Sequence, residues 1–158
     1  MRMDTACFTG HRILRRELIP EIETALEAIL EKLIARGIIH YGCGGAIGFD
    51  MIAGATVLRM KKRYPQLRLI MVLPCEHQDA KWNPVDRDKY RQLLKSADKV
   101  MYLQTSYDYQ CMLKRNRYLV DNSGVCIACL TNVRGGTAYT VRYAASQDRE
   151  IINITEMM

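Results

Sequence analysis

The sequence predicts an α/β fold in which a doubly wound, mostly parallel sheet carries helices on both faces. Short apolar segments alternate with segments of helical periodicity along all 158 residues, as expected for strands joined by crossover helices. Glycine, proline or polar clusters separate these segments and supply the turns between them. The length is that of one globular domain, so we expect residues 1–158 to fold as a single domain.

The first half of the chain holds five predicted elements. The first strand is apolar and ends at Gly10, and Pro20 suits the first turn of the helix that follows. Apolar residues repeat at helical spacing in this helix, which Gly37 ends as a C-terminal cap. The second helix closes at Pro65 and the third strand at Pro74, because proline continues neither element. In order, the elements are a strand at 5–9, a helix at 20–36, a strand at 38–41, a helix at 51–62 and a strand at 67–73.

The second half opens with the longest irregular connection, residues 75–86, which contains the only tryptophan, Trp82. A long polar connection of this kind is typical of a binding loop. Three helical patterns then alternate with three apolar strands, and Gly135-Gly136-Thr137 opens the last helix. In order, the elements are a helix at 88–95, a strand at 99–103, a helix at 109–121, a strand at 125–130, a helix at 135–146 and a strand at 151–154.

Charge and hydropathy limit the partners that we expect. The net charge is +6, from 23 basic and 17 acidic residues, but the positive side chains are scattered, so charge alone argues against a nucleic-acid partner. No apolar run approaches the roughly 18 residues of a membrane-spanning helix. Asp4 lies where a signal peptide would begin its apolar stretch. We therefore expect a cytoplasmic protein with no membrane partner.

The six cysteines are expected to be free, buried thiols. Most of them lie in or beside apolar strand-like segments, which suits a reduced compartment. Cys126 and Cys129 form a CxxC pattern, but residues three apart in a strand point to opposite faces. No second cysteine pair or nearby histidine completes a zinc site, so we expect no metal.

Five loops are predicted to meet at one edge of the sheet. In a parallel sheet of this kind, ligands bind beyond the carboxyl ends of the strands, where the strand order switches direction. The predicted loops at this edge are residues 10–12, 42–50, 75–82, 104–109 and 132–137.

The second of these loops, residues 42–50, is rich in glycine and ends in a carboxylate. Gly44, Gly45 and Gly48 allow backbone conformations and close approaches that other residues do not. Asp50 falls in the first turn of the following helix, where a carboxylate interacts favourably with the helix dipole. It is also placed to accept the hydroxyl groups of a ribose, as acidic residues do in dinucleotide-binding folds. Both interpretations remain open for Asp50.

Two further loops offer groups suited to phosphate. Gly135, Gly136 and Thr137 form either a tight turn or a set of N–H groups and a hydroxyl that bind an anion. Arg12 suits bidentate recognition of phosphate, or is a solvated surface charge. His11 beside it is either a ligand contact or a hydrogen-bonded loop residue.

Four more residues are candidates for the site. Arg115 and Asn116 lie inside a helix, where asparagine is a poor helix former, so they hydrogen-bond either to a neighbouring loop or to a ligand. Trp82 either stacks on a base or pins its loop to the core. Glu76 is, besides Asp50, the best candidate for an acid or base.

Taken together, these motifs resemble the YpsA-like branch of the SLOG superfamily. The resemblance covers nearly the whole chain and implies a bacterial protein. It is carried by Thr9-Gly10-His11-Arg12, by Gly44-Gly45-Ala46-Ile47-Gly48-Phe49-Asp50, by Arg115-Asn116 with Asp121 and Ser123, and by Gly135-Gly136-Thr137 with Tyr143-Ala144. It implies a Rossmann-like fold and a nucleotide or nucleotide-derived ligand, because the superfamily includes the LOG-type nucleotide phosphoribohydrolases and the DNA-processing protein A family. Gly10, with the residues named above, is then a ligand contact.

The sequence departs from the LOG-type enzymes at their catalytic motif. Those enzymes carry Pro-Gly-Gly-x-Gly-Thr-x-x-Glu, whose glutamate is catalytic, whereas here Val133-Arg134 precede the glycine pair and Thr140 stands where a glutamate would be sought. With no complete catalytic set, we expect a sensor or regulatory module that binds a ligand such as NAD, ADP-ribose or a nucleoside phosphate. Two alternatives remain: hydrolysis of an N-glycosidic bond by Asp50 or Glu76, and nucleic-acid binding.

The last helix also bears on assembly. Tyr139, Val141 and Tyr143 give it a second apolar face, which would permit two copies to pair. We therefore expect a homo-oligomer.

Overall fold

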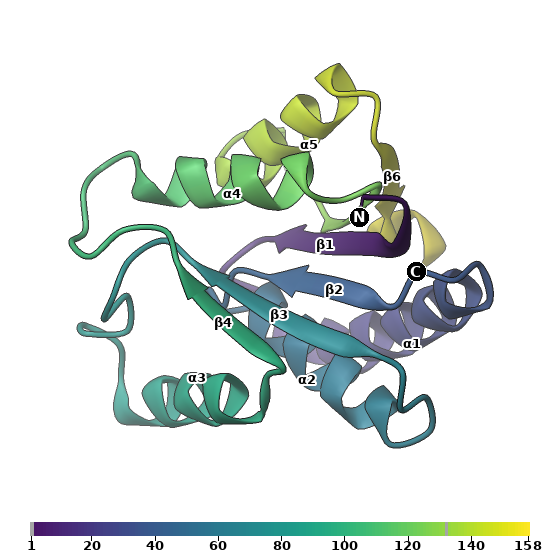
Figure 1. The fold of residues 1–158 in the computed structure, drawn as a ribbon, viewed down its shortest axis with the longest axis horizontal. Coiled ribbons are helices and arrows are strands. Elements are labelled where there is room, and N and C mark those ends of the chain that lie inside the picture. Colours follow the sequence, from purple (N-terminus) through teal and green to yellow (C-terminus); the bar gives the residue numbers. More distant parts are fainter. Residues whose placement is uncertain (1, 132) are drawn as a thin grey trace.

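All six strands form one parallel sheet in the order β4-β3-β2-β1-β5-β6 (Figure 1). A computed structural model describes residues 2–131 and 133–158; Asn132, in the predicted loop 132–137, lies outside the described residues. The prediction of a mostly parallel sheet is confirmed, and every observed pair of strands is parallel. The strands are β1 (Thr5–Gly10), β2 (His40–Cys43), β3 (Arg68–Leu73), β4 (Lys99–Tyr102), β5 (Val125–Cys129) and β6 (Glu150–Asn153).

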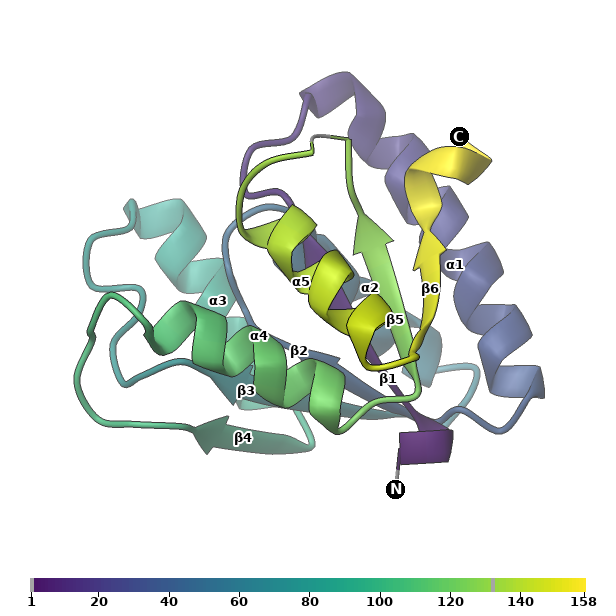
Figure 2. The ribbon, with the colours of Figure 1, turned by 90° about the horizontal axis from the view of Figure 1, so that it is seen from above.

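Helices cover both faces of the sheet, as predicted. The first three pack on one face and the last two on the other, as the views from the side and from above show (Figures 1 and 2). The helices are α1 (Ile19–Ala35), α2 (Phe49–Lys61), α3 (Pro84–Ser96), α4 (Cys111–Asp121) and α5 (Gly136–Ser146), with short 3-10 turns η1 (Arg2–Asp4), η2 (Arg16–Leu18) and η3 (Ile154–Met157). No helix in residues 2–131 and 133–158 is long and apolar enough to span a bilayer.

The observed bounds differ from the predicted ones by one or two residues at an end, and by four residues at the start of α3. Helix α3 begins at Pro84 rather than at residue 88, because the Asn83 side chain caps it by accepting the Asp86 N–H at 2.9 Å, and Pro84 fits the first turn. Strand β2 runs to Cys43, two residues further than predicted. The glycine-rich segment therefore begins inside the sheet.

The side chains alternate between the two faces of the sheet. On β3, Leu69 and Met71 belong to the larger core beneath α1–α3, while Val72 belongs to the smaller core beneath α4 and α5. Cys126 and Cys129 likewise lie in opposite cores, as their spacing predicts. All six cysteines are free and buried, which confirms that prediction.

The strand order switches direction between β1 and β5. The chain adds β2, β3 and β4 on one side of β1, and then crosses through α4 to place β5 on the other side. Helices α1–α3 therefore lie on one face and α4 and α5 on the other (Figure 1). The loops after β1 and β5 diverge to opposite faces at this point, which leaves room for a cavity.

The tyrosines proposed for an oligomer contact already pack within the chain. The Arg117 guanidinium of α4 lies 5.5 Å from the ring centre of Tyr139 and 5.7 Å from that of Tyr143. The Tyr143 hydroxyl donates to Asp121 Oδ1 at 2.7 Å. These contacts join α4 to α5 within one chain.

Candidate functional site

A cavity of about 310 Å³, here called the inner cavity, opens at the carboxyl end of β1 beside the switch in strand order. Its walls come from the end of β1, the loop before α2, and helices α2, α4 and α5. It is lined by Phe8, Thr9, Gly10, His11, Arg12, Ala46, Asp50, Met112, Leu113, Arg115, Asn116, Gly136 and Thr137. The structure thus brings together eight of the predicted site residues: Gly10, His11, Arg12, Asp50, Arg115, Asn116, Gly136 and Thr137.

A second, larger cavity of about 710 Å³, the outer cavity, lies beside the first. The two cavities share Arg12, Ala46 and Met112 as lining residues. The outer cavity adds Trp82 and Tyr107, from the loops that follow β3 and β4. The predicted binding loop 75–82 therefore faces the same edge of the sheet as the inner cavity.

Four predicted glycines lie outside the lining of both cavities. A β-carbon added at Gly44 would lie 2.6 Å from the Arg115 guanidinium carbon, and one at Gly45 would lie 2.9 Å from Tyr90. One at Gly48 would lie 2.3 Å from the Arg12 carbonyl oxygen. These three glycines therefore pack closely against Arg115, Tyr90 and Arg12 and do not line the cavities themselves. Gly135, with φ +95° and open space around it, is the N-cap of α5.

Glu76 also lies outside both cavities. It is exposed on the loop after β3, and its backbone N–H donates to the Thr105 carbonyl at 3.2 Å. Asp50 is consequently the one carboxylate among the residues that line the two cavities.

Asp50 and Arg115 place two buried, opposite charges in the wall of the inner cavity. Asp50, in the first turn of α2, is 7% exposed, and its Oδ2 accepts the Ala46 N–H at 3.2 Å. Arg115, on α4, is 3% exposed and donates from Nη1 to the Gly44 carbonyl at 2.7 Å. The tertiary role left open for Arg115 is thus a hydrogen bond to the glycine-rich loop.

Burial dominates the electrostatics of this pair. It raises the pKa of the Asp50 carboxyl above its ordinary value, although the Arg115 charge and the Ala46 N–H act in the opposite direction. Burial also lowers the pKa of the Arg115 guanidinium, and the Asp50 charge opposes that shift. A carboxylate that lacks full solvation and has one hydrogen-bond donor retains acceptor capacity for a ligand hydroxyl.

Asn116 and His11 are fixed by hydrogen bonds of their own. Asn116 Oδ1 accepts the Arg115 Nε–H at 2.9 Å. His11 Nε2 accepts the Thr131 N–H at 3.0 Å, and the His11 carbonyl accepts the Phe49 N–H at 3.1 Å. His11 is thus a hydrogen-bonded loop residue that ties the loops after β1 and β5 to the start of α2.

Two further parts of the inner cavity's lining are suited to an anion. The first turn of α5 contributes Gly136 and Thr137, and no side chain caps this helix. Its free N–H groups and the positive end of its dipole favour negative charge. The exposed Arg12 guanidinium has no hydrogen bond or ion pair with any residue in 2–131 and 133–158.

Met112 and Leu113, which were not predicted as ligand contacts, also line the inner cavity. They precede Arg115 and Asn116 by three residues each, so the four share one face of α4. That helical spacing was the available signal.

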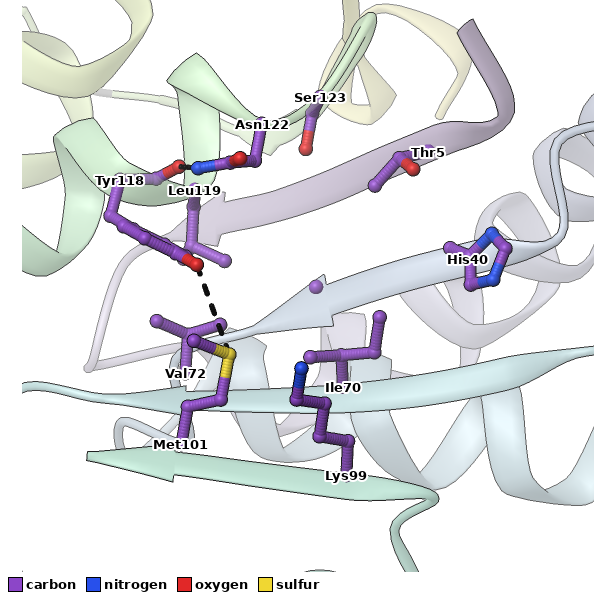
Figure 3. Close-up of a pocket in the computed structure, with 11 residues that line it drawn as sticks. Thr5, His40, Ile70, Val72, Lys99, Met101, Tyr118, Leu119, Asn122 and Ser123 are labelled. Carbon is purple, nitrogen blue, oxygen red and sulfur yellow. Dashed lines mark hydrogen bonds between the residues drawn. The ribbon is translucent and has the colours of Figure 1, made fainter. Parts of the chain in front are cut away.

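A separate cavity of about 270 Å³ lies between the C-terminal end of α4 and the face of strands β2–β4 (Figure 3). Its apolar floor includes Ile70 and Val72, and Tyr118 donates from its hydroxyl to Met101 Sδ at 3.9 Å. Lys99 lines it as well, but none of the predicted ligand-binding residues does. It is therefore distinct from the site at the carboxyl edge.

Within residues 2–131 and 133–158, no three His, Cys, Asp or Glu side chains come close enough to share an ion. A ligand would be held by the backbone N–H groups, Arg12 and Asp50.

The sequence matches a known protein family over most of its length. The YpsA model, described as the YspA SLOG family, matches residues 14–157. The SPbeta prophage-derived protein YoqJ of Bacillus subtilis is 27% identical over 137 residues, which cover 78% of this chain and 80% of YoqJ. A UPF0398 protein of Brevibacillus brevis is 29% identical over 139 residues, which cover 86% of this chain and 68% of that protein.

Solved structures share the fold at lower identity. DNA processing protein A from Helicobacter pylori, described with a single-stranded DNA binding mode, superposes with a TM-score of 0.68 at 16% identity, over 99% of this chain and 71% of that one. DNA processing protein A from Streptococcus pneumoniae gives 0.68 at 15% identity, over 94% of this chain and 49% of that one, so this chain spans about half of that protein. The protein TM1055 gives 0.57 at 17% identity, over 94% and 72%.

Proposed function

Because the chain belongs to the YspA SLOG family, we propose that it binds a nucleotide or nucleotide-derived ligand in the inner cavity, as a sensor or regulatory module. One observation carries the proposal. The cavity at the switch point combines an unpaired arginine, the uncapped first turn of a helix and a buried carboxylate.

Each of these groups matches one part of a nucleotide. The N–H groups of the first turn of α5, the Thr137 hydroxyl and the Arg12 guanidinium would hold phosphate oxygens. Asp50, which lines the same cavity, would accept ribose hydroxyls. Arg115 acts on this arrangement through Gly44, whose carbonyl it holds, and so positions the loop that leads to Asp50.

The surroundings of Thr140 favour binding over hydrolysis. Thr140 stands where the LOG-type motif has its glutamate, is 2% exposed, and donates from its hydroxyl to the Gly136 carbonyl at 2.8 Å. It therefore offers no acid or base. An N-glycosidic hydrolase would have to use Asp50, the one carboxylate that lines the cavities.

Calorimetric titration with AMP, ATP, NAD and ADP-ribose tests the proposal. We expect at least one of these to bind, and Arg12→Ala to weaken it roughly tenfold or more, because charge-assisted hydrogen bonds are lost. Arg63→Ala, two residues beyond the C-terminal end of α2, is the matched control and should bind as the parent does. Failure of all four ligands to bind to folded protein would refute the proposal.

The enzyme alternative has a separate test. Chromatography of each bound nucleotide after incubation would detect a released base. Turnover that Asp50→Asn abolishes while affinity is retained would establish a hydrolase instead of a sensor.

A second candidate function is single-stranded nucleic-acid binding. The H. pylori protein that shares this fold is described with such a mode. In this chain, Tyr107 and Tyr109 are 70% and 84% exposed on the loop between β4 and α4, at the same edge as the Arg12 guanidinium. Exposed aromatic rings near cations can stack on bases and bind phosphates. They therefore weaken the argument, made from the scattered positive charges, against a nucleic-acid partner.

Fluorescence anisotropy with a labelled oligothymidine tests this second function. Binding that falls steeply with added salt and weakens in a Tyr107→Ala/Tyr109→Ala variant would support it. A flat salt response, or no binding near physiological salt, would exclude it.

A further inference from the structure

We propose that the ligand is a dinucleotide-type molecule, with two nucleoside-like halves joined by a diphosphate, which occupies the inner and outer cavities together. This inference rests on the proposed function and specifies its ligand class. The observation behind it is that the two cavities share Arg12, Ala46 and Met112, so they are neighbours across a common wall.

The sizes of the cavities fit one half of such a ligand each, with room to spare in the outer one. Small-molecule sites span roughly 300–1,000 Å³. The inner cavity, about 310 Å³, lies at the lower end of that range, and the outer cavity, about 710 Å³, well within it. A mononucleotide would fill the first and leave the second without a role.

Arg12 lies at the junction, where the diphosphate would be. Arg12 lines both cavities, and its guanidinium is unpaired among residues 2–131 and 133–158. A diphosphate carries charge toward both halves of the molecule, which a planar, multidentate cation is suited to bind.

The backbone of this junction is fixed by two contacts with the start of α2. The His11 carbonyl accepts the Phe49 N–H at 3.1 Å. The Arg12 carbonyl lies so close to Gly48 that a β-carbon there would come within 2.3 Å. The position of Arg12 between the cavities is therefore set by the fold rather than by a loose loop.

The outer cavity is suited to a flat, aromatic group. Trp82 lines it while its ring is held by a T-shaped contact with Tyr90, at 5.0 Å between ring centres and 69° between planes. Because this contact already fixes the indole ring, Trp82 loses little side-chain conformational entropy when a base stacks on it. Nearby, Gln78, which also lines this cavity, donates from Nε2 to the Gly44 carbonyl and to the Tyr90 hydroxyl.

Calorimetry with matched probes tests the inference. AMP and nicotinamide mononucleotide are the two halves of NAD, and ADP-ribose has the same diphosphate without the second base. We expect NAD to bind at least roughly tenfold tighter than either mononucleotide, since base stacking on an aromatic side chain contributes about that factor or more. Trp82→Leu should remove most of this advantage.

A conservative variant separates stacking from folding. Trp82→Phe keeps an aromatic surface and should retain most of the preference for NAD. If both variants lose AMP binding, Trp82 shapes the inner cavity, and the assignment of a base to the outer cavity is wrong. If AMP binds and NAD binds no tighter, the inference is overturned while the proposed function stands. If no probe binds, both fail.

Discussion

The close approach of Gly48 to Arg12 can be measured by one pair of variants. Gly48 and Gly135 occupy equivalent places, as the N-caps of α2 and α5, with φ values of +92° and +95°. They differ in their surroundings: a β-carbon at Gly48 would meet the Arg12 carbonyl oxygen at 2.3 Å, whereas one at Gly135 would meet nothing within 4 Å. Gly135→Ala is therefore a matched control for Gly48→Ala.

The two substitutions should differ in free energy of unfolding. Alanine in this backbone region costs about 1–3 kcal/mol, and Gly135→Ala should show that cost alone. Gly48→Ala adds an overpacked contact worth typically about 1–3 kcal/mol, and because the obstructing atom belongs to the backbone, no side-chain rotation relieves it. We expect Gly48→Ala to be the less stable variant by about that second amount.

Urea denaturation followed by the fluorescence of Trp82, the only tryptophan, and by far-ultraviolet circular dichroism gives both values. An unchanged dependence on urea concentration would show that the unfolded states are comparable. Equal stabilities of the two variants, within about 0.5 kcal/mol, would refute the close contact and with it the fixed position of Arg12, given the usual spread between comparable sites.

Three further variants probe the charges and glycines of the fold. Arg115→Leu should destabilise the protein by about 3–5 kcal/mol in urea melts, since the donor to the Gly44 carbonyl is lost and a buried charge is left alone; a loss below about 1 kcal/mol would contradict this. Partial burial opposes ionisation of Asp98, but hydrogen bonds from Lys61 and from the Leu69 N–H hold the pKa of its carboxyl below the ordinary 3.8. The ionised carboxylate therefore stabilises the folded protein fully above about pH 4, and this stabilisation is lost as the pH falls through the folded-state pKa. Asp98→Asn should thus be less stable at pH 7 by about 1 kcal/mol, after allowance for screening, and the difference should shrink at pH 3 in parallel urea melts; a constant difference would refute the assignment. Gly136→Ala, with open space around its β-carbon, should keep or raise stability by up to about 1 kcal/mol yet weaken AMP binding, and unchanged affinity in calorimetry would argue against phosphate at α5.

Much of this architecture follows from local sequence patterns. Alternating apolar and helical segments predict the parallel sheet, and the rule for parallel sheets predicts that the loops carrying Arg12, Asp50 and Gly136 converge. The opposite faces of Cys126 and Cys129 follow from the two-residue period of a strand. These predictions need no knowledge of which distant segments touch.

The role of each glycine could not be predicted in the same way. In sequence, Gly44 and Gly136 both belong to glycine-rich turns that lead into helices. In the structure, Gly44 packs against Arg115, 71 residues away, while Gly136 has open space around it. The difference is set by long-range packing, which no local pattern records. The early start of α3, by contrast, was readable from Asn83-Pro84, a capping residue followed by a proline at the first helical position.

The switch in strand order also determines how the protein can unfold in parts. Residues up to β4 form one contiguous unit and residues from α4 onward form another, and within the sheet they meet only along the β1–β5 pairing. The Arg115 hydrogen bond to Gly44 crosses between these units, and the walls of the inner cavity come from both. A molecule bound there would act as a crosslink against sub-global opening. A bound ligand should therefore slow amide hydrogen exchange throughout β5 and β6, including residues that it does not contact.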